Sequence, residues 1–309
     1  MKNKIAIIFP YFGAWPDWFE LTLYTMKVNN FIDFHFYTDC SIPQNRANNI
    51  FFHKISFKEY CDFVSDKLKI NFYPQSAYKL CDLKPFYGFI HKDELVNYHF
   101  WGFGDIDLIY GDLRSFITDD MLNKYDLITT HADRIAGHFT IIRNNSKYSY
   151  LCLKIKNWKQ LLLEKNGKGL DEHHFTELVW PSQRYIWMMF RIIRRISKIH
   201  YFSFFEPFNN ILCSFSKCYI AELYTSPLPA DGEIWKYYLS NNKIISPRNN
   251  REIPYLHFLF FKKTPFINTS HHWKNDFFLL SKTELDNILK KKTGVIFINN
   301  LNIIYHENE

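Results

Sequence analysis

The sequence of 309 residues lacks several features that would assign it to a common protein class. Its six cysteines form no Cys-x-x-Cys pair and no zinc-ligand spacing, which favours reduced thiols in a cytoplasmic protein. No apolar run approaches the roughly 20 residues needed to cross a bilayer. Residues Ile7–Gly13 contain a single glycine and no lysine or arginine. This argues against the Gly-rich, basic phosphate loop that a nucleotidyltransferase usually carries near its first strand.

What is present is a globular composition with an excess of positive charge. Hydrophobic residues make up 47% of the chain and charged residues 22%, so a chain of this length buries a substantial core, as one large domain or two closely joined ones. The net charge of +7 favours anionic partners such as nucleotides or phospholipids. The basic and apolar start is interrupted at Pro10 and no small-residue cleavage site follows, so we expect a first strand there rather than a signal peptide.

Short apolar strands alternate with helices through the first half of the chain. We expect strands at Ile5–Phe9, Ile32–Thr38, Ile50–Ile55, Asp105–Ile109, Leu127–Thr130 and Phe139–Arg143, and helices at Pro16–Val28, Phe57–Leu68, part of Ala77–Ile90, and Tyr150–Leu163. This alternation predicts an α/β fold with crossover connections. Ligands of such sheets bind beyond the carboxyl ends of the strands, where Pro10, Asp39 and Asp105 fall.

The most informative stretch reads WGFGDIDLIYGDL, in which Asp105 and Asp107 lie two positions apart, after an expected Gly-Phe-Gly turn and before an apolar run. In a strand, side chains two apart point to the same face. Neighbouring carboxylates repel each other unless a cation lies between them, and a divalent metal with oxygen ligands meets that need. The alternative is a solvated turn in which the aspartates cap the backbone.

A third metal-ligand candidate is His257, in the apolar segment Ile253–Lys263. Together with Asp105 and Asp107 it gives a mixed oxygen and nitrogen shell suited to Mn²⁺ or Mg²⁺, with positions left for diphosphate oxygens. The alternative is a core histidine whose nitrogens are satisfied by the protein.

The loop after the first strand carries Pro10, Tyr11 and Phe12, and Asp39 follows the second strand. These residues are candidates to sandwich a nucleobase and to hydrogen-bond its edge or the ribose. The alternative is that the loop aromatics pack on the following helix. Upstream of the acidic pair, the sequence YKLCDLKP offers three charged groups.

Those three groups are Lys79, Asp82 and Lys84, which are candidates to contact the phosphate and sugar of a nucleotide ligand. Ordinary surface lysines are the alternative. In neither segment does a spacing rule alone separate the two interpretations.

Two further segments offer groups for a polyhydroxylated substrate. In THADRIAGHFTIIRN, Gly137 allows a close backbone approach, and Asp133 and His138 supply polar groups. Asp171 and Glu172 open a predicted helix, where they act either as caps or as a base and a sugar-binding group. For proton removal from a substrate hydroxyl, Asp171 or Glu172 is the candidate, with Asp133 behind them.

A basic amphipathic segment spans Arg184–Phe202. Its cations are Arg184, Arg191, Arg194, Arg195 and Lys198, interleaved with apolar residues. Such a helix either lies on an anionic membrane or packs its apolar stripe inside the domain.

In this order, the motifs resemble the GT-A class of nucleotide-sugar-dependent glycosyltransferases, and more narrowly a bacterial family found with surface-polysaccharide genes. The stretches that carry the resemblance are KIAIIFPYFGAWPDWFE, FYTDC, AYKLCDLKPFYGFIH, FWGFGDIDLIYGDL, DLITTHADRIAGHFTIIRN, LDEHHF and IPYLHF. The resemblance implies that Asp105 faces the donor ribose and the metal, and that Asp107 and His257 are metal ligands. It also implies that Asp171 and Glu172 lie near the transferred sugar.

The resemblance covers about residues 1–265, which we expect to form a GT-A-like catalytic domain with a mixed sheet, and 266–309 would be a C-terminal extension packed on it. It implies a metal-dependent transferase that uses a nucleoside diphosphate donor, a UDP-sugar, and a glycan or lipid-linked glycan acceptor. We expect a cytoplasmic protein, peripheral on the inner membrane face, with no nucleic acid partner. The alternatives are a nucleotidyltransferase acting on sugar phosphates and a non-enzymatic module that binds glycan or nucleic acid.

Overall fold

The computed structural model describes residues 3–16, 18–44, 47–131, 134–180, 213, 216–220, 223, 225–226, 233–258, 282–299 and 303–307. A seven-stranded sheet lies at the centre of this part of the chain, with the strand order β3-β2-β1-β4-β7-β6-β8. Its strands are β1 (Ile5–Pro10), β2 (Ile32–Thr38), β3 (Ile50–Lys54), β4 (Phe100–Gly104), β6 (Leu127–Thr129), β7 (Phe139–Arg143) and β8 (Cys218–Ile220).

The first four strands of the sheet run parallel, and β7 runs antiparallel to both β4 and β6. The fold class is therefore mixed α/β. Strand β1 pairs in register with both neighbours, Ile5 opposite Ile32 and Ile5 opposite Phe100, so the carboxyl ends of three strands meet at one edge. Pro10 ends β1 at that edge.

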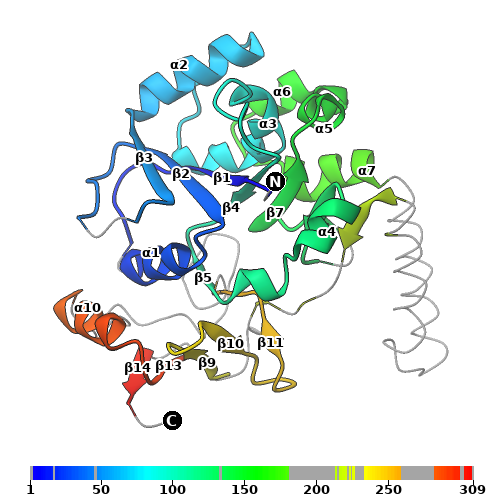
Figure 1. Ribbon diagram of the computed structural model, residues 1–309. Helices are drawn as coiled ribbons and strands as arrows, with labels where there is room; N and C mark the ends of the chain where they lie inside the picture. Colours follow the sequence, from blue (N-terminus) through cyan, green and yellow to red (C-terminus); the bar gives the residue numbers. More distant parts are fainter. Residues whose placement is uncertain are drawn as a thin grey trace.

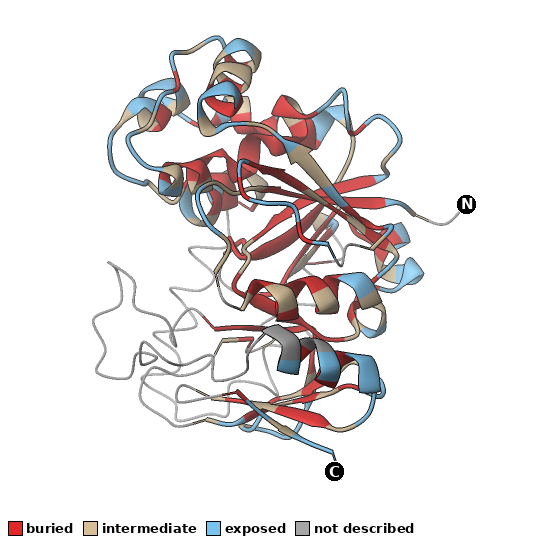
Figure 2. Ribbon diagram, turned by 90° about the vertical axis from the view of Figure 1, so that its left-hand side faces the viewer, coloured by how far each residue is buried: buried red, intermediate tan, exposed pale blue. Residues whose placement is uncertain are grey.

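Helices cover both faces of this sheet. Figures 1 and 2 show α2, α3, α5 and α6 on one side of the sheet and α1 on the other. The helices of this region are α1 (Phe19–Val28), α2 (Phe57–Leu68), α3 (Tyr87–Ile90), α4 (Asp119–Lys124), α5 (Ser146–Ser149), α6 (Trp158–Leu163) and α7 (Thr176–Val179), with the 3₁₀ helices η1 (Ala77–Phe86), η2 (Leu113–Ser115) and η3 (Leu151–Lys154) and the π-helix η4 (Leu170–Phe175). Among the described residues, no helix combines the length and apolar character required to cross a membrane.

Helix α2 has the bounds that the sequence predicts, because both of its ends are encoded locally. The Ser56 hydroxyl accepts a hydrogen bond from the Glu59 N–H, and the Glu59 carboxylate accepts one from the Ser56 N–H, which forms a capping box. Lys69 ends the helix in the left-handed conformation, with φ 53°.

The single helix expected over Tyr150–Leu163 is wrong. The chain forms η3, an extended residue at Ile155 and then α6. Asn157, which precedes α6, has φ 56°, a conformation that no continuous right-handed helix accommodates. Asparagine adopts the left-handed region more readily than most residues, so the interruption is a local property that helical periodicity does not reveal.

The strand expected at Asp105–Ile109 is also wrong. Strand β4 ends at Gly104, strand β5 (Leu108–Tyr110) begins three residues after Asp105, and the acidic pair lies in the bend between them. The Ile106 carbonyl accepts hydrogen bonds from Trp18 Nε1 and Thr22 Oγ1, both at 3.2 Å, so helix α1 holds the bend in place.

Glycine is what lets β4 lie in the middle of the sheet. A Cβ on Gly102 would come within 2.3 Å of the Thr140 carbonyl oxygen and 2.6 Å of Ile7 Cδ1. The sequence pattern suggests a turn at this Gly-Phe-Gly, but the absence of side chains here serves close packing within the sheet.

Two smaller sheets complete the described fold. Strand β12 (Tyr255–His257) pairs antiparallel with β5. A five-stranded sheet has the order β11-β10-β9-β13-β14. Its strands are β9 (Trp235–Tyr238), β10 (Lys243–Ile245), β11 (Glu252–Ile253), β13 (Val295–Ile298) and β14 (Ile303–His306), and helix α10 (Lys282–Lys291) accompanies it.

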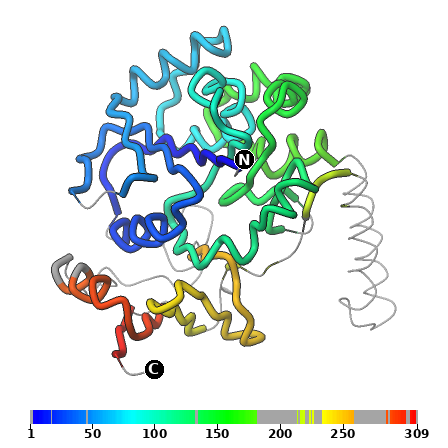
Figure 3. Tube along the Cα trace, in the orientation of Figure 1, coloured from blue at the N-terminus to red at the C-terminus, as the bar shows by residue number. Residues whose placement is uncertain are grey.

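The five-stranded sheet joins segments on both sides of the boundary expected after residue 265, because β9 pairs with β13. Figure 3 shows the yellow trace of β9 and β10 beside the red trace of β13 and β14. Its buried residues, Trp235 and Ile296 among them, share an apolar cluster with Leu21 of α1. The basic segment Arg184–Phe202 lies outside the described residues, so its predicted contact with a membrane stays a prediction.

Candidate metal centre

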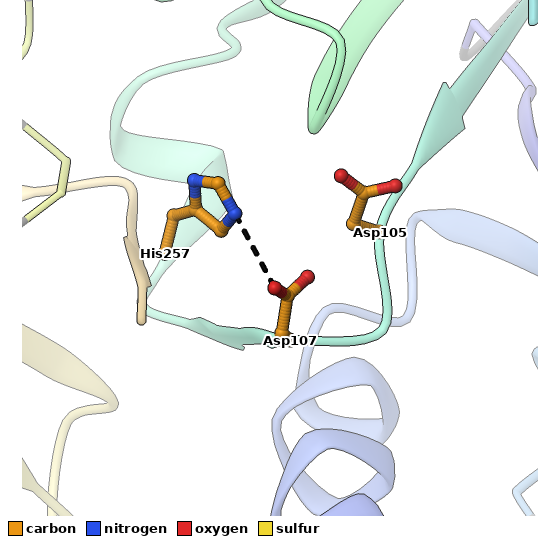
Figure 4. A group of neighbouring side chains, drawn as sticks. All are labelled: Asp105, Asp107 and His257. Atoms are coloured by element: carbon orange, nitrogen blue, oxygen red, sulfur yellow. Dashed lines mark ion pairs between the residues drawn. The ribbon is translucent and has the colours of Figure 1, made fainter. Parts of the chain in front are cut away.

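Two aspartates from the bend after β4 and one histidine from far along the chain converge at the edge of the central sheet. Asp105, Asp107 and His257 each offer one ligand atom, and these atoms all lie within 4.8 Å of one another (Figure 4). The His257 Nε2 atom lies 3.4 Å from Asp107 Oδ2. Asp107 precedes β5 and His257 ends β12, and the pairing of these two strands places His257 opposite Leu108.

Backbone hydrogen bonds fix the same convergence. The Phe258 N–H donates to the Asp107 carbonyl at 3.2 Å, and the His257 N–H donates to the Thr225 carbonyl at 2.8 Å. On the other side, the Asp105 N–H donates to the His138 carbonyl at 3.0 Å. The metal-ligand candidates are thus placed by main-chain contacts and not only by side-chain packing.

Burial makes this donor set suitable for a cation. Asp107 and His257 are almost fully buried, at 3% and 6% exposed, while Asp105 is half-buried. Buried carboxylates need a compensating charge, and two carboxylates with one imidazole form a ligand set that hard or borderline divalent ions accept. The residues present therefore fit one divalent metal ion.

A buried lysine adjoins the cluster. The Lys84 ammonium donates to Asp105 Oδ1 at 2.7 Å and to the Gly137 carbonyl at 2.8 Å, and lies 3.9 Å from Asp171 Oδ2. Burial disfavours the ammonium, but the charge of Asp105, with that of Asp171, outweighs it and holds the pKa of Lys84 well above its usual value. Lys84 thus joins one member of the cluster to a second carboxylate.

That second carboxylate belongs to η4, a π-helix, a conformation that is frequent at functional sites. A Cβ on Gly137 would lie 2.4 Å from Asp171 Oδ2 and 3.1 Å from Glu172 Oε1, so a larger residue there would have to displace the Asp171 carboxylate. Glu172 forms an ion pair with Arg134 at 3.3 Å. Burial raises the pKa of Asp171 to about 7, although Lys84 opposes the shift.

The structure does not bring Lys79 and Asp82 into the cluster. The Lys79 ammonium donates to Asp82 Oδ2 at 2.7 Å and to the carbonyls of Leu161 and Asn166, each at 2.9 Å. Asp82 also accepts the Lys168 N–H, at 2.9 Å to Oδ2. This buried pair fastens the loop that leads into η4, and contact with a nucleotide ligand stays a prediction for it.

The loop after β1 is ordered by its own contacts. The ring of Tyr11 stacks on that of Trp15, with centroids 5.1 Å apart, and Phe12 packs into the main apolar core. The Gly13 N–H donates to Asp39 Oδ1 at 2.8 Å. Burial, then the charges of Cys40 and Asp107, raise the pKa of Tyr11. Nucleobase binding by this loop stays a prediction.

Asp133, predicted to act behind Asp171 and Glu172, lies outside the described residues. Ser226, which the sequence does not single out, has its hydroxyl 3.3 Å from His257 Nδ1 and so contacts the candidate ligand on its far side. A lone serine in a segment without a motif carries no signal that could have identified it.

Comparison with known proteins gives a family and a set of structural likenesses, among them two solved structures with low TM-scores. No curated protein sequence matches the chain. The structure of mouse xyloside xylosyltransferase 1 in its apo form is similar with a TM-score of 0.35 and 9% identity, over 58% of this chain and 82% of that one. Glycosyltransferase GlyE of Streptococcus pneumoniae TIGR4 gives a TM-score of 0.29 and 13% identity, over 57% of this chain and 42% of that one.

At these TM-scores the two likenesses assign neither an activity nor a site. The sequence match is broader, because a family of unknown function (DUF6625) matches residues 7–288. This match spans the central sheet, the acidic bend and His257, and it extends into α10. The chain belongs to the DUF6625 family.

Proposed function

We propose that the protein is a metal-dependent glycosyltransferase, which moves a sugar from a nucleoside diphosphate donor, a UDP-sugar, to a hydroxyl of a bacterial surface glycan such as capsule, O-antigen or lipooligosaccharide. The observation that carries the proposal is the Asp105–Asp107–His257 cluster, with Lys84 and Asp171 beside it. The order of the sequence motifs, which resembles that of GT-A enzymes, supports it.

In this proposal Asp105, Asp107 and His257 hold Mn²⁺ or Mg²⁺. An ion held by these three residues would supply Lewis-acid stabilisation of the leaving diphosphate, an effect worth roughly several kcal/mol of barrier. The protein keeps the three ligands in place through the bend at Ile106 and the pairing of β5 with β12. Lys84 neutralises Asp105 on the side that faces Asp171.

Asp171 is the candidate base for an inverting course. With a pKa of about 7, its carboxyl is partly ionised at neutral pH, which suits a group that accepts a proton during the reaction. Its carboxylate takes the proton of the acceptor hydroxyl, the acceptor oxygen bonds to the sugar, and the bond to the diphosphate breaks with the electron pair leaving on phosphate. Glu172 is the second candidate, and Asp133 stands behind both. In a retaining course the leaving phosphate takes the proton instead.

Of the remaining predicted residues, some would contact the donor and others would hold the surrounding loops in place. Tyr11 and Asp39, with Pro10 and Phe12 shaping the loop, would receive the nucleoside. Gly137 and His138 would line the position of the donor sugar. The buried Lys79–Asp82 pair would act through the loop that precedes η4.

Docking on the inner membrane face belongs to the same proposal and depends on the segment Arg184–Phe202. Flotation with anionic liposomes tests it, with the charge reversal of Arg194 and Arg195 as the matched variant. Equal recovery with neutral liposomes, or with the charge-reversed variant, would contradict membrane docking and leave the transferase proposal intact.

The central experiment is a calorimetric screen of UDP, GDP, CMP and TDP with and without Mn²⁺, followed by assay of UDP release from UDP-sugars. We expect binding of UDP that requires Mn²⁺ and is lost in Asp107→Asn. Nucleotide binding that is indifferent to metal, or unchanged transfer by Asp107→Asn, would refute the metal assignment. Salt-dependent binding of polymer without turnover would favour the non-enzymatic module.

A further inference from the structure

His138 occupies an unusual place between two of the three candidate ligands. Its backbone carbonyl accepts the Asp105 N–H at 3.0 Å. Its imidazole stacks on that of His257, with ring centroids 4.2 Å apart and planes inclined by 21°. One residue therefore touches two ligands that lie far apart in the sequence, the first through its main chain and the second through its ring.

The orientation of the rings excludes His138 from the ligand shell. An imidazole nitrogen coordinates a metal along a lone pair that lies in the plane of the ring. Two nearly parallel rings stacked at 4.2 Å have planes that intersect far beyond coordination distance, so they cannot share one ion. The three-residue ligand group accordingly omits His138.

The buried Nε2 atom of His138 does not hold the ring in place through a hydrogen bond. His138 is 4% exposed, and among the described residues its Nε2 atom has no hydrogen-bond partner. An unpartnered buried nitrogen costs free energy and contributes no bond. What the side chain does supply is its flat surface, with His131 and Tyr255 packed edge-on against it at 4.8 and 5.5 Å.

His257 needs such a surface. Its Nε2 side faces Asp107 and its Nδ1 side faces Ser226, at 3.4 and 3.3 Å, which restrains the ring in its own plane. Neither contact prevents tilting out of that plane. A ring stacked on the face of the imidazole supplies the missing restraint, because tilting His257 would lose the favourable stacking energy of the aromatic pair.

We propose that His138 is a positioning residue: its ring, through stacking and not through its nitrogens, holds His257 in the orientation that binds the metal. This inference rests on the proposed function, because it assumes that the cluster holds an ion. It predicts that an aromatic ring without nitrogen can replace His138 and that a polar group without a ring cannot.

The test compares His138→Phe, which keeps a ring, with His138→Gln, which keeps a polar nitrogen, in calorimetric titration of the full chain with Mn²⁺ alone. We expect His138→Phe to bind Mn²⁺ within about twofold of the unsubstituted protein. We expect His138→Gln to bind about tenfold or more weakly, the usual size of an effect transmitted through a ligand's supporting contact. A melting temperature measured without metal separates loss of fold from loss of affinity.

His91→Gln is the matched control, because His91 is another fully buried histidine with an unpartnered nitrogen, and it packs against Tyr37 and Tyr60. We expect its Mn²⁺ affinity to be unchanged. Equal weakening in His138→Phe and His138→Gln, or unchanged affinity in His138→Gln, would overturn the positioning role while Mn²⁺ binding by the unsubstituted protein stands. Absence of Mn²⁺ binding by the unsubstituted protein would remove the proposed metal site as well. If His138→Gln does not fold, His138→Phe decides alone.

Discussion

Two buried lysines on the same 3₁₀ helix, η1, have opposite surroundings. Lys79 has one carboxylate and two carbonyl oxygens within 2.9 Å, so its three donors are satisfied inside the protein. Lys84 has one carboxylate and one carbonyl at that range, with a second carboxylate 3.9 Å away. The first closes a loop, while the second stands between a candidate metal ligand and a candidate base.

Charge and burial alone therefore do not identify a functional lysine. Both side chains are at most 7% exposed, and both came from one short motif. What differs is the partner: Asp82 is 2% exposed and bound by backbone amides, whereas Asp105 is 33% exposed and belongs to the metal cluster. Because Asp105 is accessible, it can bind a further ligand such as a metal ion in addition to Lys84, which buried Asp82 cannot do.

Lys79→Met should give the largest loss of stability. It leaves the Asp82 carboxylate buried without a counter-ion, which typically costs about 3–5 kcal/mol. The free energy of unfolding from urea denaturation measures it. A loss no larger than that of an exposed lysine such as Lys58, the partner of Asp62 in α2, would contradict the structural role.

The next largest effect is a pH dependence of the free energy of unfolding, which comes from Asp171 beside Lys84. The pKa of Asp171 is about 7 in the folded protein, against the ordinary 3.8, with burial as the main cause, Lys84 opposing it, and Glu172 adding to it ahead of a weaker contribution from Asp105. The folded state therefore holds this proton more tightly than the unfolded state, and stability falls as pH rises from about 4 to 7. The contribution is at most about 4 kcal/mol, from roughly 1.4 kcal/mol per pH unit.

Asp171→Asn removes the titrating group, so its unfolding free energy should decline less than that of the unsubstituted protein across this pH range. Urea denaturation at several pH values checks this difference. If both proteins show the same slope, Asp171 titrates near its ordinary pKa, and its assignment as a base poised at neutral pH fails.

Metal binding should separate the Lys79–Asp82 pair from the Asp105–Asp107–His257 cluster directly. At a Mn²⁺ concentration of 100 times the dissociation constant, a single site stabilises the folded state by about 2.7 kcal/mol. We expect Lys79→Met to keep this increment and Asp107→Asn to lose it, because only Asp107 belongs to the cluster. Thermal denaturation with Mn²⁺ and with EDTA measures both. An increment that persists in Asp107→Asn would place the ion elsewhere.

Lys84→Met should have the smallest effect on stability, about 1–3 kcal/mol, the usual cost of leaving a buried polar partner unsatisfied. Asp105 is partly exposed to water, which screens its charge, and Asp171 can bind a proton, so neither carboxylate is left as a fully buried charge without compensation. Sugar transfer should nevertheless fall in this variant more than in Lys79→Met. A larger loss of stability in Lys84→Met than in Lys79→Met, or a smaller loss of activity, would contradict the different roles assigned to the two lysines.

Sequence reasoning was accurate where local chemistry encodes the structure. The bounds of β2 and α2 are confirmed, because an apolar strand pattern in one and a capping box in the other are complete within a few residues. It failed where backbone conformation depends on distant packing. The glycines of β4 predict a turn, but Gly102 lies in a strand where Thr140 and Ile7 leave no room for a Cβ. The acidic pair lies in a bend because hydrogen bonds from α1 and its N-cap hold the Ile106 carbonyl.

The sequence by itself determined that the chain forms an α/β sheet and that Asp105, Asp107 and His257 are its candidate metal ligands, since composition, periodicity and motif order are properties of the chain alone. Only the tertiary structure decided that their ligand atoms meet within 4.8 Å, that Lys79 and Lys84 have different partners, and that His138 packs on His257. The physical reason is that strand pairing between β5 and β12, and burial beside η4, are long-range contacts whose partners no local spacing specifies.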